Sequence, residues 1–207
     1  MTDRYDATGS IEGRYQPGSN GKVLANKLGI TDPSEMDDVE LELLDQLSGA
    51  VIAEVAVDQQ ITLADVYEWH RRWLGNVYDW AGRDRSVNMG KDDFQFAAAG
   101  QIPRLMDIFE KQFLGIYTPC MGMTDESLVE AIAAVHIEFV LVHPFREGNG
   151  RLSRLIATVM ALQAGNSALD FSFLDRNKSR YFSAIQAGLV DTKPMSDLFR
   201  QVLLESG

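Results

Sequence analysis

Hydrophobic and polar positions along the chain follow a period that predicts helices over most of its length. Apolar residues recur at helical spacing over residues 37–57, 62–74, 102–113, 152–164, 177–189 and 194–206. Residues 125–142 carry apolar side chains on almost every side of the expected helix, which is typical of a helix buried in a core. The pattern therefore predicts an all-α fold with one fully buried helix.

A break in the helical pattern predicts one β-hairpin. Ser86–Met89 and Phe94–Phe96 are short extended runs, and they flank Gly90–Asp93. Glycine and aspartate favour tight turns between strands. We expect this hairpin to be the only sheet of the fold.

The sequence shows no internal repeat and no domain boundary. A chain of 207 residues with 45% hydrophobic residues can bury one sizeable core. Residues 1–34 are expected to be an N-terminal arm and lead-in segment, with Met1–Asn20 as a loose polar arm, and residues 35–207 to be the domain. The acidic residues between Asp32 and Asp45 are expected to form a solvated helix face.

Charge and cysteine content exclude several classes of protein. The net charge is −11 and the isoelectric point is about 4.7, which argues against binding to nucleic acid or to anionic membranes. Cys120 is the single cysteine, so an internal disulfide is excluded and a reducing compartment is favoured. No run of about twenty apolar residues and no signal-peptide core appear in the sequence. We expect a cytoplasmic protein.

The segment from His143 to Arg154 carries most of the candidate chemistry. It lies between the buried helix and the next one, and Pro144 disfavours helical geometry at His143, so the first helix should end there. The N-terminus of the second helix offers unpaired N–H groups that bind anions. Gly148 and Gly150 let the backbone approach such an anion closely. The segment therefore predicts a phosphate-binding loop.

The side chains of this loop complete the expected site. Asn149 can donate its amide, and Arg151 and Arg154, three residues apart, can each contact phosphate oxygens. Glu147 is an oxygen ligand suited to a Mg²⁺ ion that bridges phosphates. His143 can take a proton from a hydroxyl. Phe145 is expected to anchor the loop in the core.

Each of these features has an ordinary structural interpretation when taken alone. A histidine near the end of a buried helix is usually a packing residue, a Gly-Asn-Gly run is usually a turn, and two arginines are usually a solvated helix face. Their combination in this order argues for function. His70 and His136 are too scattered to specify a metal site, and His136 is expected to pack between helices.

The pattern His-x-Phe-x-(Asp/Glu)-Gly-Asn-Gly-Arg-x-x-Arg resembles the active-site motif of the Fic family, and this chain fills every position. The resemblance implies a Fic-fold helical bundle with a hairpin flap over the active site. It also implies transfer of a nucleoside monophosphate, most often AMP from ATP, to a Tyr, Ser or Thr hydroxyl of a target protein, with release of pyrophosphate. The roles that it implies are general base for His143, Mg²⁺ ligand for Glu147, anion hole for Gly148, Asn149 and Gly150, β-phosphate contact for Arg151 and γ-phosphate contact for Arg154.

Two further stretches resemble the family. Val77–Gly82, followed by Arg85 and Phe94, is similar to the flap region, which pairs with an extended segment of the target; the flap residues are Gly90, Lys91, Asp92, Asp93 and Phe94. The alternative is a surface hairpin without a function. Arg180–Ala184 resembles the helix beside the adenine pocket, where Tyr181 is either a nucleotide contact or a core aromatic.

The resemblance leaves three functions open. A family branch that phosphorylates carries a lysine at the position of Gly150, so Gly150 favours AMP transfer. Transfer of another nucleotide or of phosphocholine is an alternative of the same class. A silenced binding module is an alternative from a different class.

Family members are commonly restrained by a Ser/Thr-x-x-x-Glu-Gly/Asn helix whose glutamate pairs with the second arginine, here Arg154. Thr8–Gly13 fits the letters, but Gly9 and Gly13 make it a poor helix. Tyr15–Ser19 and the residues up to Ile30 resemble the start of short Fic toxins that pair with a separate antitoxin. We therefore expect a small antitoxin as a partner, and in those toxins DNA gyrase and topoisomerase IV are the targets.

Overall fold

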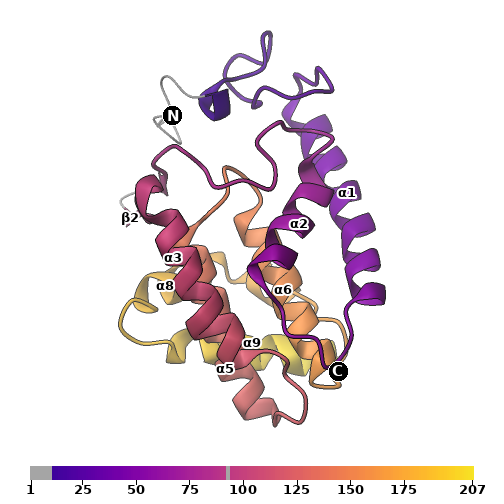
Figure 1. Cartoon of the computed structure of the whole chain (residues 1–207), viewed down its shortest axis with the longest axis vertical. Coiled ribbons are helices and arrows are strands. Elements are labelled where there is room, and N and C mark those ends of the chain that lie inside the picture. Colours follow the sequence, from indigo (N-terminus) through magenta and orange to yellow (C-terminus); the bar gives the residue numbers. More distant parts are fainter. Residues whose placement is uncertain (1–10, 92–93) are drawn as a thin grey trace.

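The computed structural model describes residues 11–91 and 94–207. Its secondary structure is mostly helical (Figure 1). The α-helices are α1 (Pro33–Glu54), α2 (Leu63–Leu74), α3 (Ile102–Phe109), α4 (Gly115–Tyr117), α5 (Asp125–Val142), α6 (Asn149–Gln163), α7 (Ser172–Arg176), α8 (Lys178–Ala187) and α9 (Lys193–Ser206). The strands β1 (Gly90–Lys91) and β2 (Phe94–Gln95) pair antiparallel. The predicted all-α class with one small hairpin is confirmed.

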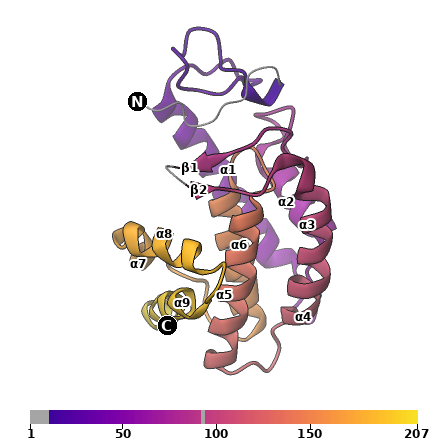
Figure 2. The ribbon, with the colours of Figure 1, turned by 90° about the vertical axis from the view of Figure 1, so that its left-hand side faces the viewer.

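Helix α5 forms the centre of the core. It packs against α3, α6, α8 and α9, and Figure 2 shows α5 and α6 side by side between α3 and the α7–α9 group. Thr124 caps its N-terminus by accepting the N–H of Ser127, and Asp125 and Glu126 in the first turn suit the positive end of the helix. Most of this helix from Leu128 to Val142 is buried, as its sequence predicts, whereas Glu130 is exposed.

Helix α2 packs against α1, and a capping motif defines its start. Thr62 and Asp65 form a reciprocal capping box at its start. Its buried face carries Trp69, His70 and Trp73. This face supports the loop between α5 and α6.

Several helix boundaries differ from the sequence predictions. Helix α1 begins at Pro33 rather than residue 37, because Asp32 caps it and proline is well suited to the first helical position. The helix expected over residues 102–113 continues through a π-helical turn (Glu110–Leu114) into α4. Helix α7 is too short to show a helical period and was not predicted.

The hairpin is shorter than the sequence predicts. The first strand was expected at Ser86–Met89, and the structure places it at Gly90–Lys91. One further backbone bond, from the N–H of Phe96 to the carbonyl of Met89 (3.1 Å), extends the pairing, and the carbonyl oxygens of Val87 (2.5 Å) and Ala97 (2.6 Å) accept from the Arg85 guanidinium. Gly90 and Lys91 are therefore strand residues rather than turn residues, and Asp92 and Asp93 lie outside the described residues.

The expectation of a loose arm up to Asn20 is wrong for its described part. A 3₁₀ turn covers Ile11–Gly13, and Tyr15 forms a β-bridge with Leu24. The N–H of Gln16 donates to the carbonyl of Val23 at 2.8 Å, and Ser19 is buried. This segment packs on the body of the domain.

No helix within residues 11–91 and 94–207 has both the length and the apolar character needed to cross a membrane.

Packing of α9 on the core is testable with two leucines of the same helix. Leu198 is fully buried, whereas Leu204 is 70% exposed. We expect Leu198→Ala to lower the free energy of unfolding by about 2–5 kcal/mol, because it removes buried methyl groups and leaves a cavity. Leu204→Ala should change it by less than about 0.5 kcal/mol. Urea unfolding of both variants measures the difference, and equal losses would contradict this packing.

Candidate active site

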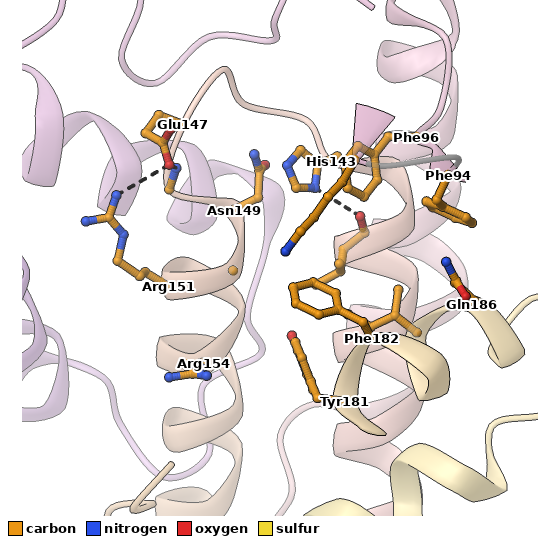
Figure 3. Close-up of a pocket in the computed structure, with 15 residues that line it drawn as sticks. Phe94, Phe96, His143, Glu147, Asn149, Arg151, Arg154, Tyr181, Phe182 and Gln186 are labelled. Carbon is orange, nitrogen blue, oxygen red and sulfur yellow. Dashed lines mark hydrogen bonds and ion pairs between the residues drawn. The ribbon is translucent and has the colours of Figure 1, made fainter. Parts of the chain in front are cut away.

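A cavity of about 370 Å³ opens where the hairpin, the loop between α5 and α6, and α8 meet (Figure 3). The expected site residues His143, Glu147 and Arg154 line it together with the loop glycines. Its lining residues are Lys91, Phe94, Phe96, Val140, His143, Glu147, Gly148, Asn149, Gly150, Arg151, Arg154, Tyr181, Phe182, Ile185 and Gln186. Of the predicted flap residues, Lys91 and Phe94 contribute to the wall.

His143 follows the last residue of α5 in a left-handed conformation, with φ 52° and ψ 60°. Pro144 stops the helix there, as predicted. Its Nδ1 lies 3.1 Å from the carbonyl oxygen of Val140, which can only accept, so Nδ1 carries the proton and Nε2 has a free lone pair. Its ring stacks on Phe96 at 3.8 Å, and burial lowers the pKa of His143 to about 3. The imidazole is therefore neutral at pH 7 and able to accept a proton.

Arg85 fixes the backbone around His143. This side chain is 2% exposed, and it donates to the carbonyls of His143 (2.6 Å) and Val142 (3.3 Å) as well as to two carbonyls at the base of the hairpin. The positive charge also suits the negative end of α5. The backbone at His143 and the base of the hairpin are therefore held by the same side chain.

Asn149 shapes the loop rather than presenting its amide to the cavity. Its Oδ1 accepts the N–H of Phe145 at 2.9 Å, and its Nδ2 donates to the carbonyl of Phe145 at 2.7 Å. Phe145 is fully buried, as expected. The loop therefore closes on itself and directs the first turn of α6 at the cavity, where helix N–H groups lack intrahelical partners.

Two features of its position require glycine at residue 148: a positive φ and a close contact with the Trp73 ring. Its φ is +85°, and a Cβ at this position would lie 2.5 Å from the Trp73 ring. Its N–H donates to Glu147 Oε1 at 2.9 Å. At Gly150, by contrast, a Cβ would meet nothing within 4 Å.

Arg151 is held by a residue that the sequence pattern misassigned. Its Nη2 lies 2.5 Å from Oε2 of Glu40 and 3.4 Å from Oε1 of Glu147, and its guanidinium covers the Trp73 ring at 4.7 Å. Glu40 is 3% exposed rather than part of a solvated acidic face, and its Oε1 accepts the hydroxyl of Tyr78 at 2.6 Å. Burial raises the pKa of Glu40, and the positive charge of Arg151 opposes that shift. No periodic signal distinguishes Glu40 from its acidic neighbours.

Arg154 forms an ion pair with Asp175 at 2.8 Å and lies over the Phe171 ring at 5.2 Å. Glu12, the glutamate of the candidate inhibitory segment, lies elsewhere. Its carboxylate accepts the N–H of Ser86 at 2.9 Å at the base of the hairpin. Thr8 lies outside the described residues. The geometry gives no support to a contact between Glu12 and Arg154.

Helix α8 forms the wall opposite the loop. Tyr181 lies in it with its hydroxyl 2.7 Å from Nε2 of His136, which is buried between α5 and α9 as expected for a packing residue. Lys91 of β1 lies over the Phe182 ring at 3.3 Å and connects the hairpin to α8. Phe182 belongs to the stretch that resembles the helix beside the adenine pocket, whereas sequence reasoning missed Gln186, which lies four residues further along on the same helix face.

Glu147 is the carboxylate in the loop between α5 and α6, and its side chain is 41% exposed. Among the residues that the structure describes, no group of three or more His, Cys, Asp or Glu side chains is arranged to hold a metal ion. A single carboxylate with phosphate oxygens and water is nevertheless a donor set that suits Mg²⁺. The residues present therefore fit a Mg²⁺ ion that arrives with a polyphosphate.

A neutral histidine with a free Nε2 thus faces a helix N-terminus flanked by two arginines. The first can remove a proton from a hydroxyl, and the second can bind phosphates. This arrangement suits transfer of a phosphate-linked group to a hydroxyl.

Known families and curated proteins that resemble this chain agree with transfer of a phosphate-linked group. The Fic/DOC family matches residues 60–161. The protein adenylyltransferase VbhT of Bartonella schoenbuchensis is 28% identical over 183 residues, which cover 88% of this chain but only 37% of that protein. The probable protein adenylyltransferase y4lH of Sinorhizobium fredii is 27% identical over 188 residues, which cover 90% of this chain and 93% of that protein.

Solved structures include a close match in fold. The crystal structure of BepC, a VirB-translocated effector protein of Bartonella tribocorum with bound AMPPNP, has a TM-score of 0.74 and 25% identity. The alignment covers 92% of this chain and 96% of that chain. The helical arrangement of this chain is therefore shared, over the aligned 92%, with that AMPPNP-bound protein.

The two loop glycines provide a matched test of the loop geometry. We expect Gly148→Ala to lower the free energy of unfolding by about 1–3 kcal/mol, because alanine is strained at positive φ and its methyl group overlaps Trp73. Gly150→Ala should leave it unchanged or raise it by up to about 1 kcal/mol, because alanine favours the start of α6. Chemical denaturation measures both, and a stable Gly148→Ala variant would contradict the described contact.

The three histidines should all remain neutral in the folded chain at mildly acidic pH. Burial lowers the pKa values of His70, His136 and His143 to about 4, 3 and 3 from an ordinary value of 6.5. The unfolded chain therefore binds more protons below pH 6.5, so the histidine contribution to stability is complete above pH 6.5 and is lost as the pH falls toward 4 for His70 and toward 3 for His136 and His143. We expect no histidine ring signal to titrate between pH 8 and 5.5 in NMR spectra. A ring that titrates near 6.5 would contradict the described burial.

Proposed function

Residues 60–161 belong to the Fic/DOC family, and on that premise we propose that this protein transfers AMP from ATP to a Tyr, Ser or Thr hydroxyl of a target protein. The observation that carries the proposal is the free Nε2 of His143, which faces the phosphate-binding turn of α6 across one cavity. The relatives named as adenylyltransferases and the AMPPNP bound to BepC support it.

His143 is the general base of the proposed reaction. Its Nε2 takes the proton of the target hydroxyl, and the hydroxyl oxygen attacks the α-phosphorus of ATP. The bond from that phosphorus to the oxygen bridging to the β-phosphate breaks. AMP is then joined to the target, pyrophosphate leaves, and His143 releases the proton to solvent.

The loop and its arginines bind the triphosphate in this proposal. The first turn of α6, with Gly148 and Gly150, receives the α- and β-phosphates, and Arg151 and Arg154 neutralise the remaining charge. Glu147 holds Mg²⁺, which stabilises negative charge on the phosphates when bound. Tyr181 and Phe182 provide the wall for the adenine ring.

The hairpin is the proposed docking site for the target. Strands β1 and β2 form a two-stranded sheet beside the cavity, and an unpaired strand edge binds an extended peptide by main-chain hydrogen bonds. A target segment docked there presents its hydroxyl to His143. Gly90, Lys91 and Phe94 are the described residues of this surface.

Two further points extend the proposal. Gly150 stands at the position where the phosphorylating branch carries a lysine, and this favours AMP over phosphate as the transferred group. We also propose a small antitoxin that supplies a glutamate to Arg154. Asp175, the present partner of Arg154, is 51% exposed, which makes the pair easy to exchange.

The direct test is labelling of the protein and of a cell lysate with α-³²P-ATP and Mg²⁺. We expect protein-bound label from wild type and a loss of at least about 10²-fold in His143→Ala, because the general base is removed. No protein-bound label should appear from γ-³²P-ATP. The control is AMPPNP binding, which His143→Ala should retain because the phosphate contacts are intact.

Other outcomes would contradict the proposal in distinct ways. Label from γ-³²P-ATP would identify a kinase. Unlabelled protein and lysate, from a wild-type preparation that binds AMPPNP, would identify a nucleotide-binding module.

A further inference from the structure

We infer that His70 is a positioning residue that orients the peptide group between Glu147 and Gly148, and with it an N–H donor of the phosphate-binding loop. This inference rests on the proposed function only for the role of that donor in nucleotide binding. His70 lies on α2, is fully buried and has no place in the proposed chemistry. Its contacts are with two backbone groups from different segments.

The hydrogen bonds of His70 determine its tautomer. The N–H of Gly82 donates to Nδ1 at 2.8 Å, and a peptide N–H cannot accept. Nδ1 is therefore unprotonated and Nε2 carries the hydrogen. Nε2 lies 3.1 Å from the carbonyl oxygen of Glu147, to which it donates. Both ring nitrogens are thus used, each in one role.

The ring is also fixed in orientation. It stacks on Phe145 with centroids 3.8 Å apart and planes 6° apart, and it meets Trp73 edge-on at 6.2 Å. The loop that contains Gly82 packs closely on α2, since a Cβ at Gly82 would lie 2.7 Å from Cβ of Arg71. The imidazole therefore cannot rotate away from Glu147 without disturbing the loop that contains Gly82.

The planarity of the peptide bond transmits this contact to the cavity. The carbonyl of Glu147 and the N–H of Gly148 belong to one trans peptide unit, so they point in opposite directions. With the carbonyl held toward His70 in the core, the N–H must point away from it, and it donates to Glu147 Oε1 on the cavity side. His70 therefore sets the direction of an N–H at the place where the proposed phosphates bind.

A purely structural role for His70 would depend on its ring filling the core. The positioning role depends on one donor at the location of Nε2. Glutamine places its amide nitrogen near the location of imidazole Nε2, whereas asparagine places its amide near that of Nδ1. Both variants lose the stacking on Phe145, so His70→Gln and His70→Asn form a matched pair that separates the two roles.

We expect His70→Asn to weaken AMPPNP binding and to lower kcat/KM for AMP transfer by about 10–100-fold, the range typical for residues that orient a binding group. His70→Gln should remain within about threefold of wild type in both measurements, although the two variants should lose similar thermal stability. In ¹⁵N–¹H spectra, the amide signal of Gly148 should shift in His70→Asn and stay near its wild-type position in His70→Gln.

Equal losses of AMPPNP affinity in the two variants would overturn the inference, as would an unshifted Gly148 signal in His70→Asn. The Gly148 signal and AMPPNP binding decide the role of His70 without any transfer assay. A wild-type protein that binds AMPPNP but transfers no AMP would therefore refute the proposed activity alone.

Discussion

One buried guanidinium determines how His143 and the hairpin lie relative to each other. Arg85 donates to carbonyls at the end of α5 and at the base of the hairpin, and a buried cation is costly unless such oxygens surround it. The hairpin base therefore cannot move away from His143 without exposing or unpairing this charge. The cavity between them keeps its width because both of its sides are fastened to the same side chain.

The features that could be predicted from the sequence are those that depend on residues close together in the chain. Pro144 ends α5, Thr62 caps α2, and the order of residues from His143 to Arg154 identified the cavity wall that holds them. Each of these features depends on residues that lie within a few positions in the sequence. The all-α class and the turn that leads from His143 into α6 could therefore be predicted without any tertiary contact.

The residues that the sequence did not predict act through distant partners. Glu40 contacts a residue 111 positions away, and His70 contacts one 77 positions away. No periodicity records such a pairing, and the acidic neighbours of Glu40 made a solvated face the natural expectation. Arg85 likewise donates to the carbonyl of His143, 58 positions away, and no local propensity predicts that contact.

The indole ring of Trp73 contacts three residues around the loop between α5 and α6. It packs against Gly148, lies under Arg151 and donates its indole N–H to the carbonyl of Glu40 at 2.8 Å. Indole emission responds to nearby charge, and this ring is fully shielded from water. Trp73 is one of three tryptophans in the chain, and its share of the emission should change when an anion draws Arg151 away from the indole, so this ring is an intrinsic optical probe of the start of α6.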